Sequence, residues 1–377
     1  MPNDSVEKWV NGTADDGAKI GSGATIRYMA IEKRYGEIQA LHPTTLEIPS
    51  GEFFSVIGPS GSGKTTLLGV TVGFVTPSAG KIEINGTDIV RIPPFHRNIG
   101  MVFQSYSLFP HMTVAENIAF PLKMRKFPKS VIEKRTLRML SMVRLEGMRD
   151  RKPAQLSGGQ RQRVALARAS VYDPLLLLMD EPLSALDKNL REEMQVEIKQ
   201  FQQTLGTTVL YVTHDQTEAA SMSDRIAIMN HGSIQQIGSP RELYEQPGSR
   251  FVASFLGDAN LFDVRDSSRS DVGWELRTAE GHVFKAVTDL KDNGNLAICV
   301  RPECLVLNAE RPAADNSVEA TVTSVVFSAG TLVVRMQTAT GRVLIYRRTS
   351  GESSFVPSLG DTVFASFSVD DTLVLRV

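Results

Sequence analysis

The sequence predicts an α/β domain followed by a small all-β domain. From about Thr25 to Gly238, strand-like apolar runs alternate with helix-like segments, which is the pattern of a sheet layered with helices. After Gly248, short alternating runs follow one another closely without helical segments, as in a small β-barrel or sandwich. The 377 residues suffice for both domains, since single cores usually stop growing before ~300 residues.

These patterns divide the chain into three segments. Residues 1–24 lack the basic start and apolar centre of a secretory signal, and their Gly, Asp and Ser content predicts a flexible leader. Residues 25–248 form the α/β domain, in which a charged, Met-rich stretch at about 105–165 predicts a helical subdomain. Residues 249–377 form the β-barrel domain.

Charge and composition exclude several classes of protein. The 41 basic and 42 acidic residues give a net charge of -1, which argues against a general polyanion binder. The most apolar short run, PLLLLMD, is too short for a spanning helix, so we expect the chain not to cross a membrane by itself. Cys299 and Cys304 have no Cys or His cluster nearby, and we interpret them as reduced thiols of a cytoplasmic protein.

Four apolar runs of strand length mark the sheet of the α/β domain, and each of them ends at a polar residue. They are EFFSVIG at 52–58, NIGMVFQ at 98–104, LLLLMD at 175–180 and TTVLYVTH at 207–214. Ligands of open α/β sheets bind at the carboxyl ends of the strands. We therefore expect a binding site at these four strand ends.

The segment GPSGSGKTT, Gly58 to Thr66, matches the phosphate-loop pattern G-x-x-x-x-G-K-[ST] between a predicted strand and a predicted helix. Its glycines free the backbone to turn N–H groups toward phosphate, and the helix start adds partial positive charge. Lys64 is expected to neutralise the β- and γ-phosphates, and Thr65 to offer a hydroxyl to Mg²⁺. The residues predicted to bind nucleotide here are Ser60, Gly61, Gly63, Lys64, Thr65 and Thr66.

Two acidic residues follow the apolar run that starts at Leu175. Asp180 ends that strand and is placed to reach the shell of the metal ion. Glu181 comes next, directly before Pro182, and a carboxylate there can polarise an attacking water as a general base. The alternative for Glu181 is a surface acid or the cap of the following helix.

A second glycine-rich loop opens another helix in LSGGQRQRVALARA, Leu156 to Ala169. Because the first N–H groups of a helix have no partner inside it, SGGQ is a second candidate anion site. Two such sites on one chain could bind two phosphates. Alternatively, two chains could share one phosphate.

In order and spacing, these motifs resemble the nucleotide-binding subunits of ATP-binding cassette (ABC) transporters. The resemblance runs from Thr25 to about Gly248 and includes Gln104 in VFQSYSLFPHMTV, the segment SALD, and His214 in VTHD. It implies an ATPase that forms a head-to-tail homodimer, in which Lys64 of one chain and the second loop of the other face the same ATP. The residues implied on that second side are Ser157, Gly158, Gly159 and Gln160.

The same resemblance implies roles for further residues. Tyr35 would stack on adenine, Gln104 would contact Mg²⁺ or water and relay the nucleotide state, Asp187 would help to bridge the dimer, and His214 would contact the γ-phosphate. From the residues alone, Tyr35 could equally be a core or edge tyrosine, and a lone histidine at a strand end is usually structural. The apolar segment Tyr106–Met112 is either core or the socket for a partner helix.

The C-terminal region resembles the regulatory (TOBE) domain of importer ATPases, an oligonucleotide-binding-type barrel. SRFVASFLGDANLF, Ser249 to Phe262, resembles its join, and VRPECLVL, Val300 to Leu307, resembles its signature. The join is closest to the polyamine branch, which serves spermidine and putrescine; ferric iron, sulfate, phosphonate, sugar and glycerol phosphate importers are the alternatives. The implied partners are two integral membrane permease subunits and a periplasmic or lipid-anchored solute-binding protein, at the cytoplasmic face of the inner membrane.

Two other functions fit the sequence less well. A soluble, nucleic-acid-associated cassette would use the barrel to bind oligonucleotide, but RPECLVLNAERPAADNS is not a basic track with interleaved aromatics. A P-loop kinase or GTPase leaves Leu156–Gln160 unexplained and needs a guanine-reading motif that we do not find. We therefore expect ATP and Mg²⁺ as cofactors and no nucleic acid as partner.

Overall fold

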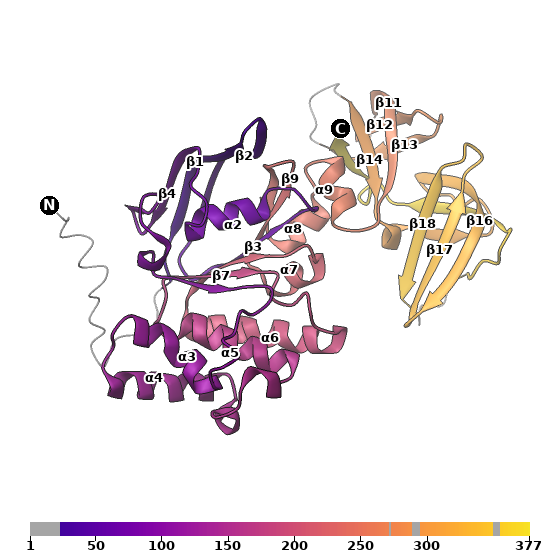
Figure 1. The fold of residues 1–377 in the computed structure, drawn as a ribbon. Coiled ribbons are helices and arrows are strands. Elements are labelled where there is room, and N and C mark those ends of the chain that lie inside the picture. Colours follow the sequence, from indigo (N-terminus) through magenta and orange to yellow (C-terminus); the bar gives the residue numbers. More distant parts are fainter. Residues whose placement is uncertain (1–22, 271–272, 289–294, 350–354) are drawn as a thin grey trace. The chain divides into compact units, whose positions relative to one another are not determined.

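The computed structural model describes residues 23–270, 273–288, 295–349 and 355–377, so most of the predicted leader at 1–24 lies outside the described residues. The chain divides into two compact units, Met1–Pro240 and Arg241–Val377 (Figure 1). The predicted division between residues 248 and 249 lies a little further along the chain and stays a prediction. Among the described residues, no helix is both long and apolar enough to cross a membrane.

A six-stranded sheet with the order β10-β9-β3-β8-β7-β6 forms the centre of the first unit. All its neighbouring strands are parallel except β9 and β10, which form an antiparallel hairpin that turns at His231-Gly232. Its strands are β3 (Phe53–Ile57), β6 (Ile99–Val102), β7 (Leu176–Asp180), β8 (Thr208–Val212), β9 (Arg225–Asn230) and β10 (Ser233–Gly238). The α/β prediction is confirmed.

The central strands are buried on both faces because they are apolar at most positions and their side chains alternate between two cores. In β7, Leu177 and Met179 pack in one core while Leu176 and Leu178 pack in the other. The first core lies against helices α3 to α6, and the second against α2 and a smaller sheet, as Figure 1 shows.

The helices of the first unit are α2 (Lys64–Val72), α3 (Val114–Met124), α4 (Lys129–Met142), α5 (Gly158–Ser170), α6 (Lys188–Leu205) and α7 (Gln216–Met222). The smaller, antiparallel sheet has the order β2-β1-β4-β5. It consists of β1 (Ile26–Tyr35), β2 (Ile38–Ile48), β4 (Ala79–Ile84) and β5 (Thr87–Asp88). Single turns of 3-10 helix span Pro94–His96, Glu146–Met148 and Pro153–Gln155.

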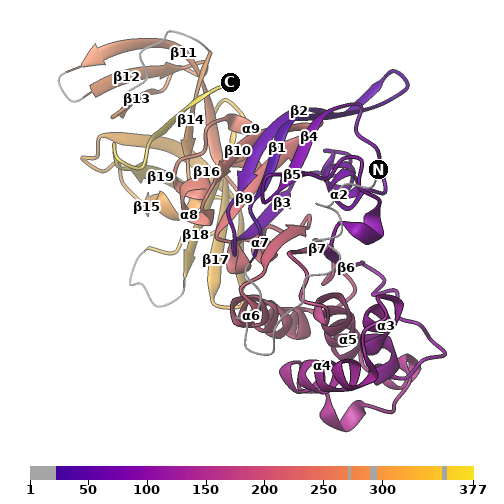
Figure 2. The same ribbon diagram turned by 90° about the vertical axis from the view of Figure 1, so that its left-hand side faces the viewer.

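From β11 onward, the secondary structure of the described C-terminal residues consists of strands and one turn of 3-10 helix, in agreement with the all-β prediction. The strands form two five-stranded sheets whose paired strands are antiparallel (Figure 2). One sheet contains β11 (Asn260–Ser270), β12 (Gly273–Thr278), β13 (Val283–Ala286), β14 (Leu296–Val300) and β20 (Leu373–Arg376). The other contains β15 (Val306–Asn308), β16 (Asn316–Ser328), β17 (Thr331–Gln337), β18 (Val343–Thr349) and β19 (Thr362–Phe367).

Two short helices, α8 (Pro240–Glu245) and α9 (Arg250–Phe255), precede these sheets. The buried Arg301, from the sequence RPE, donates hydrogen bonds to the carbonyl oxygens of Ala253 and Tyr244 at 2.8 and 3.1 Å. Pro302–Cys304 form a turn of 3-10 helix next to it. Arg301 therefore links both short helices to the sheets. Cys299 and Cys304 are both free thiols, in agreement with the prediction.

Candidate active site

The predicted phosphate loop, Asp180 and the predicted catalytic residues lie at the carboxyl ends of four neighbouring parallel strands, in the sheet order β3-β8-β7-β6. The register brings these ends level, since Asp180 at the end of β7 pairs with Val212 at the end of β8. Taken in that order, the strands are followed by the loop Gly58–Gly63, His214, Glu181 and Gln104. The sheet thus brings together residues that are up to about two fifths of the chain apart, as predicted for an open α/β sheet.

Glycine is required in the loop between β3 and α2. Gly61 and Gly63 have φ angles of 77° and 99°, in the left-handed region that side chains rarely adopt. A Cβ atom on Gly58 would lie 2.2 Å from the carbonyl oxygen of Met229, so no larger residue fits there. Ser60, Gly61 and Thr65 are exposed around this loop, and Thr66 is half-buried.

Lys64, the first residue of α2, is buried and folds its ammonium group back over the loop. Its Nζ donates to the carbonyl oxygens of Gly58 and Pro59 at 2.8 and 2.9 Å. Burial lowers the pKa of Lys64, while the carboxylates of Glu181 and Asp180 raise it. The loop therefore presents a positive charge that is partly removed from water, close to two acids.

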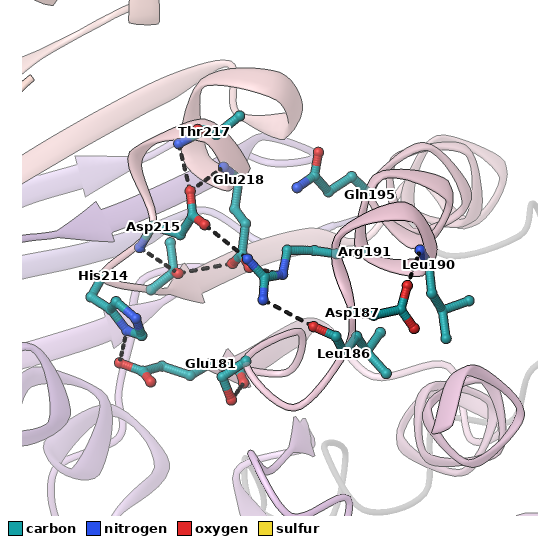
Figure 3. A network of polar contacts seen from close by, with 12 residues as sticks. Glu181, Leu186, Asp187, Leu190, Arg191, Gln195, His214, Asp215, Thr217 and Glu218 are labelled. Atoms are coloured by element: carbon teal, nitrogen blue, oxygen red, sulfur yellow. Dashed lines mark hydrogen bonds and ion pairs between the residues drawn. The ribbon is translucent and has the colours of Figure 1, made fainter. Parts of the chain in front are cut away.

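Glu181 has an unusual backbone for a non-glycine residue, with a φ angle of 43°. Its N–H donates to the carbonyl oxygen of Val212 at 2.8 Å, and its own carbonyl oxygen accepts from Ser184 Oγ at 2.9 Å. Its carboxylate Oε1 lies 3.0 Å from Nδ1 of His214 (Figure 3). A positive φ angle at a residue other than glycine costs energy, and it is found mainly where the function of a site requires it. The fold thus holds the carboxylate toward the end of β8.

Asp180 ends β7 directly before Glu181, and Gln104 follows β6, the neighbour of β7 on the side away from β8 and His214. Burial raises the pKa of Asp180, the charge of Glu181 raises it further, and Lys64 lowers it. Gln104 Nε2 donates to Ser184 Oγ at 3.2 Å. A hollow of about 500 Å³ lies here, lined by Phe103, Gln104, Ser105, Asp180, Ser184 and Ala185.

The second glycine-rich loop starts α5 through a capping box. The hydroxyl of Ser157 accepts from the N–H of Gln160 at 3.3 Å, and Oε1 of Gln160 accepts from the N–H of Ser157 at 2.9 Å. A Cβ atom on Gly158 or Gly159 would lie 3.0 Å from the side chains of Leu186 or Leu190. The two glycines therefore let this helix start lie close to the segment that follows Glu181, while Ser157 stays exposed.

Tyr35 and Asp187 are both accessible. Tyr35 ends β1 with 48% of its surface exposed, and Nζ of Lys33 lies 4.8 Å from its ring centroid. Tyr35 is therefore not a core residue. Asp187 is the N-cap of α6 and accepts a hydrogen bond from the N–H of Leu190 at 3.1 Å.

The segment Tyr106–Met112 is partly core. Tyr106 is buried in the first core, and burial raises its pKa. Arg168 of α5 donates to the carbonyl oxygens of Tyr106 and Ser107, both at 2.8 Å. Phe109 packs on Phe120 with ring centroids 4.5 Å apart. The remainder of the segment is exposed or half-buried. The core alternative therefore holds for Tyr106, and the socket for a partner helix stays a prediction.

The structure adds four polar residues to which the sequence analysis assigned no role: Ser184, Arg191, Asp215 and Glu218. Asp215 is the N-cap of α7, with Glu218 three residues later, which is a helix-start pattern that the sequence carries. For Arg191, on a polar stretch of α6, the sequence shows no comparable signal.

Known family models match segments of both units of the chain. The ABC transporter family model matches residues 41–184, and the TOBE domain model matches residues 298–375. A spermidine/putrescine import ATP-binding protein PotA from Thermobifida fusca is 44% identical, over 89% of this chain and 88% of that protein. The PotA protein of Mannheimia succiniciproducens is 48% identical, over 75% of this chain and 77% of that protein.

Solved structures match more than half of the chain. A dimeric ATP-binding cassette in a post-hydrolysis state, bound to ADP and Pi, is 35% identical with a TM-score of 0.51, over 57% of this chain and 99% of that one. The ADP conformation of an ATP-binding cassette of an ABC transporter is 26% identical with a TM-score of 0.55, over 62% and 98% of the two chains. The chain belongs to the family of ABC transporter ATP-binding proteins that carry a C-terminal TOBE domain, and it is an ATPase.

Proposed function

We propose that this chain is the ATP-hydrolysing subunit of an importer for polyamines of the spermidine and putrescine type. The observation that carries the proposal is the 42–48% identity to spermidine/putrescine import ATP-binding proteins. In the longest of these matches it extends over 89% of the chain, which takes in most of both units.

In the proposed mechanism, each side chain acts from the position described above. Lys64 and the N–H groups of the loop bind the β- and γ-phosphates, and the exposed ring of Tyr35 stacks on adenine. Glu181 accepts a proton from the attacking water, as a general base. His214, 3.0 Å from Glu181, orients this carboxylate and contacts the γ-phosphate.

The residues present fit a Mg²⁺ ion. Thr65, Asp180 and Gln104 offer the hydroxyl, carboxylate and amide oxygens that this hard cation prefers. Among the described residues, no group of three or more His, Cys, Asp or Glu side chains could hold a metal by itself, so phosphate oxygens would complete the shell. Bound there, Mg²⁺ supplies charge neutralisation at the β- and γ-phosphates.

We propose that two copies form a head-to-tail dimer, in which Ser157–Gln160 of one chain face the ATP bound at Lys64 of the other. Two features support it. The exposed Ser157 and the free N–H groups of the α5 start offer an anion site, and a related cassette has been solved as a dimer. ATP would then close the dimer, and Asp187 would lie at the same interface.

The dimer is tested by Ser157→Arg in a Glu181→Gln background, where ATP is bound but not consumed. The bulky side chain should abolish the ATP-dependent dimer in sedimentation velocity, while the affinity of the dilute single chain for ATP stays within about 3-fold. Loss of the Ser157 cap itself should cost only about 1 kcal/mol, which thermal unfolding monitors. If ATP affinity of the single chain fell sharply instead, the loop would serve the nucleotide of its own chain.

For transport, we propose two permease subunits that dock near Tyr106–Met112 and a periplasmic or lipid-anchored solute-binding protein. The ATPase would lie peripherally on the cytoplasmic face of the inner membrane. Leu108, Phe109 and Met112 of the docking segment are half-buried, and Arg168 of α5 donates to two carbonyl oxygens of the segment. Because α5 begins at Ser157, closure of the dimer and movement of the docking segment would be mechanically linked.

The solute is tested by deleting the gene and measuring uptake of radiolabelled spermidine and putrescine by the intact cells. We expect uptake at nanomolar to micromolar solute to fall to the background level and to return with the wild-type chain but not with Lys64→Ala. Ferric iron, sulfate, phosphonate, sugar and glycerol phosphate are measured in parallel. Selective loss of one of those would assign the importer to that solute instead.

A further inference from the structure

One guanidinium group touches both segments that carry the proposed catalytic residues. Arg191 lies in the first turn of α6, and its side chain points back between the strand ends (Figure 3). Its NH2 group donates to the carbonyl oxygen of Leu186 at 3.0 Å, on the segment that follows Glu181. Its NH1 group donates to Asp215 Oδ2 at 3.3 Å, directly after His214.

A buried carboxylate completes the environment of this arginine. The side chain of Glu218 is only 3% exposed, and its Oε1 lies 3.7 Å from Nε of Arg191. Its other oxygen, Oε2, accepts from the hydroxyls of Tyr211 and Thr213 at 2.7 and 2.8 Å. Burial raises the pKa of Glu218, and the nearby Arg191 lowers it. Each oxygen of Glu218 thus has its own set of partners.

Each contact of Arg191 is connected to a proposed catalytic residue through few further hydrogen bonds. The contact with Leu186 is connected to Glu181, and the contact with Asp215 to His214. On one side, the N–H of Leu186 donates to Leu183, and Ser184 Oγ donates to the carbonyl oxygen of Glu181. On the other side, the N–H of Asp215 donates to Thr213 Oγ1 at 3.0 Å, so the residues flanking His214 are held from both ends. The carboxylate of Glu181 and the ring of His214 then meet 3.0 Å apart.

We propose that Arg191 is a positioning residue for ATP hydrolysis, which sets the separation of the Glu181 and His214 segments by binding Leu186 and Asp215 with one planar fork. The inference rests on the catalytic roles proposed for those two residues. A guanidinium can bridge two acceptors at a fixed angle, whereas a lysine ammonium is a point charge on a flexible stem. A displacement of about 1 Å at a reacting group can cost on the order of 100-fold in rate.

A purely structural role for Arg191 predicts a different result when its charge is removed. Arg191 could serve only to neutralise the buried carboxylate of Glu218, because an unpaired buried charge is strongly destabilising. In that case a variant in which both charges are removed should behave like the wild type. If Arg191 positions the two segments, removal of both charges should repair stability but not catalysis.

The experiment compares Arg191→Met, Arg191→Lys and the double variant Arg191→Met with Glu218→Gln. The glutamine amide oxygen can still accept from Tyr211 and Thr213. We expect Arg191→Met to lower kcat by about 10- to 100-fold, with KM for ATP within about 3-fold, and to lower Tm. The double variant should recover Tm but keep the low kcat, and Arg191→Lys should keep most of Tm with a low kcat. Lys188→Met, in the same turn with a side chain that is 86% exposed, is the matched control and should match the wild type.

Two outcomes would overturn the inference: recovery of both kcat and Tm in the double variant, or a wild-type kcat in Arg191→Met. If Arg191→Met does not fold, Arg191→Lys and the double variant still decide between the two roles. Glu181→Gln separates this inference from the proposed function. Normal hydrolysis by Glu181→Gln would remove the catalytic assignment itself, whereas an inactive Glu181→Gln together with a fully active Arg191→Met would remove only the positioning role.

Discussion

Replacing Glu181 with glutamine should lower kcat for ATP hydrolysis by roughly 100- to 10,000-fold, the usual contribution of a positioned general base. The amide is nearly isosteric and can still accept from His214, but it cannot take a proton from water. Lys64 and the loop are unchanged, so ATP should still bind and hold the chains together as a dimer. Phosphate release measures turnover, and sedimentation velocity with ATP measures the dimer.

The control for this variant is Glu192→Gln, which makes the same chemical change on α6 at a side chain that is 61% exposed. It should hydrolyse ATP at the wild-type rate. Turnover of Glu181→Gln at the normal rate would show that another group activates the water. A Glu181→Gln variant that lost ATP binding would point instead to a role in holding the fold of the loop.

Lys64→Ala should lower kcat/KM for ATP by at least about 100-fold, because the phosphates lose the ammonium that offsets their charge. The loss should be seen both in binding and in turnover. The carbonyl oxygens of Gly58 and Pro59 also lose the donor Lys64 Nζ, which at the buried Gly58 should cost about 1–3 kcal/mol of stability. Thermal unfolding measures this loss separately from the loss of binding. Titration with a fluorescent ATP analogue measures the affinity.

Lys81→Ala is the matched control for Lys64→Ala, since Lys81 is an exposed lysine on β4 of the same unit. It should bind and hydrolyse ATP like the wild type. Lys64→Ala with unchanged affinity and turnover would contradict the assignment of the phosphate loop. Comparable losses in both variants would indicate a general effect of net charge and not a contact with phosphate.

The phosphate loop, Asp180 and Glu181 could be predicted from the sequence because their chemistry is local. The glycines, the lysine and the hydroxyl of the loop are consecutive, and its backbone conformation depends on residues such as Gly61 and Gly63 that leave few alternatives. The same holds for the capping box that starts α5 at Ser157, which is contained within four residues.

The environment of Arg191 could not be predicted in this way. On a polar helix surface, an arginine with buried partners has the same sequence pattern as one that faces solvent. Its partners Leu186, Asp215 and Glu218 become recognisable only when β7 and β8 pair and α6 and α7 pack beside them. The contact between Glu181 and His214 likewise depends on that strand register and not on either motif alone.

The sequence by itself determined the order of elements, the nucleotide-binding motifs and the all-β character of the C-terminal unit. These features follow from consecutive residues and from the short-range periodicity of apolar side chains. Both determine local backbone structure independently of where the segment lies in the fold. Only the tertiary structure decided which side chains meet, as when one guanidinium joins the segments of Glu181 and His214. The physical reason is that hydrogen bonds and ion pairs between distant segments require distances of a few ångströms, which are set by sheet register and packing.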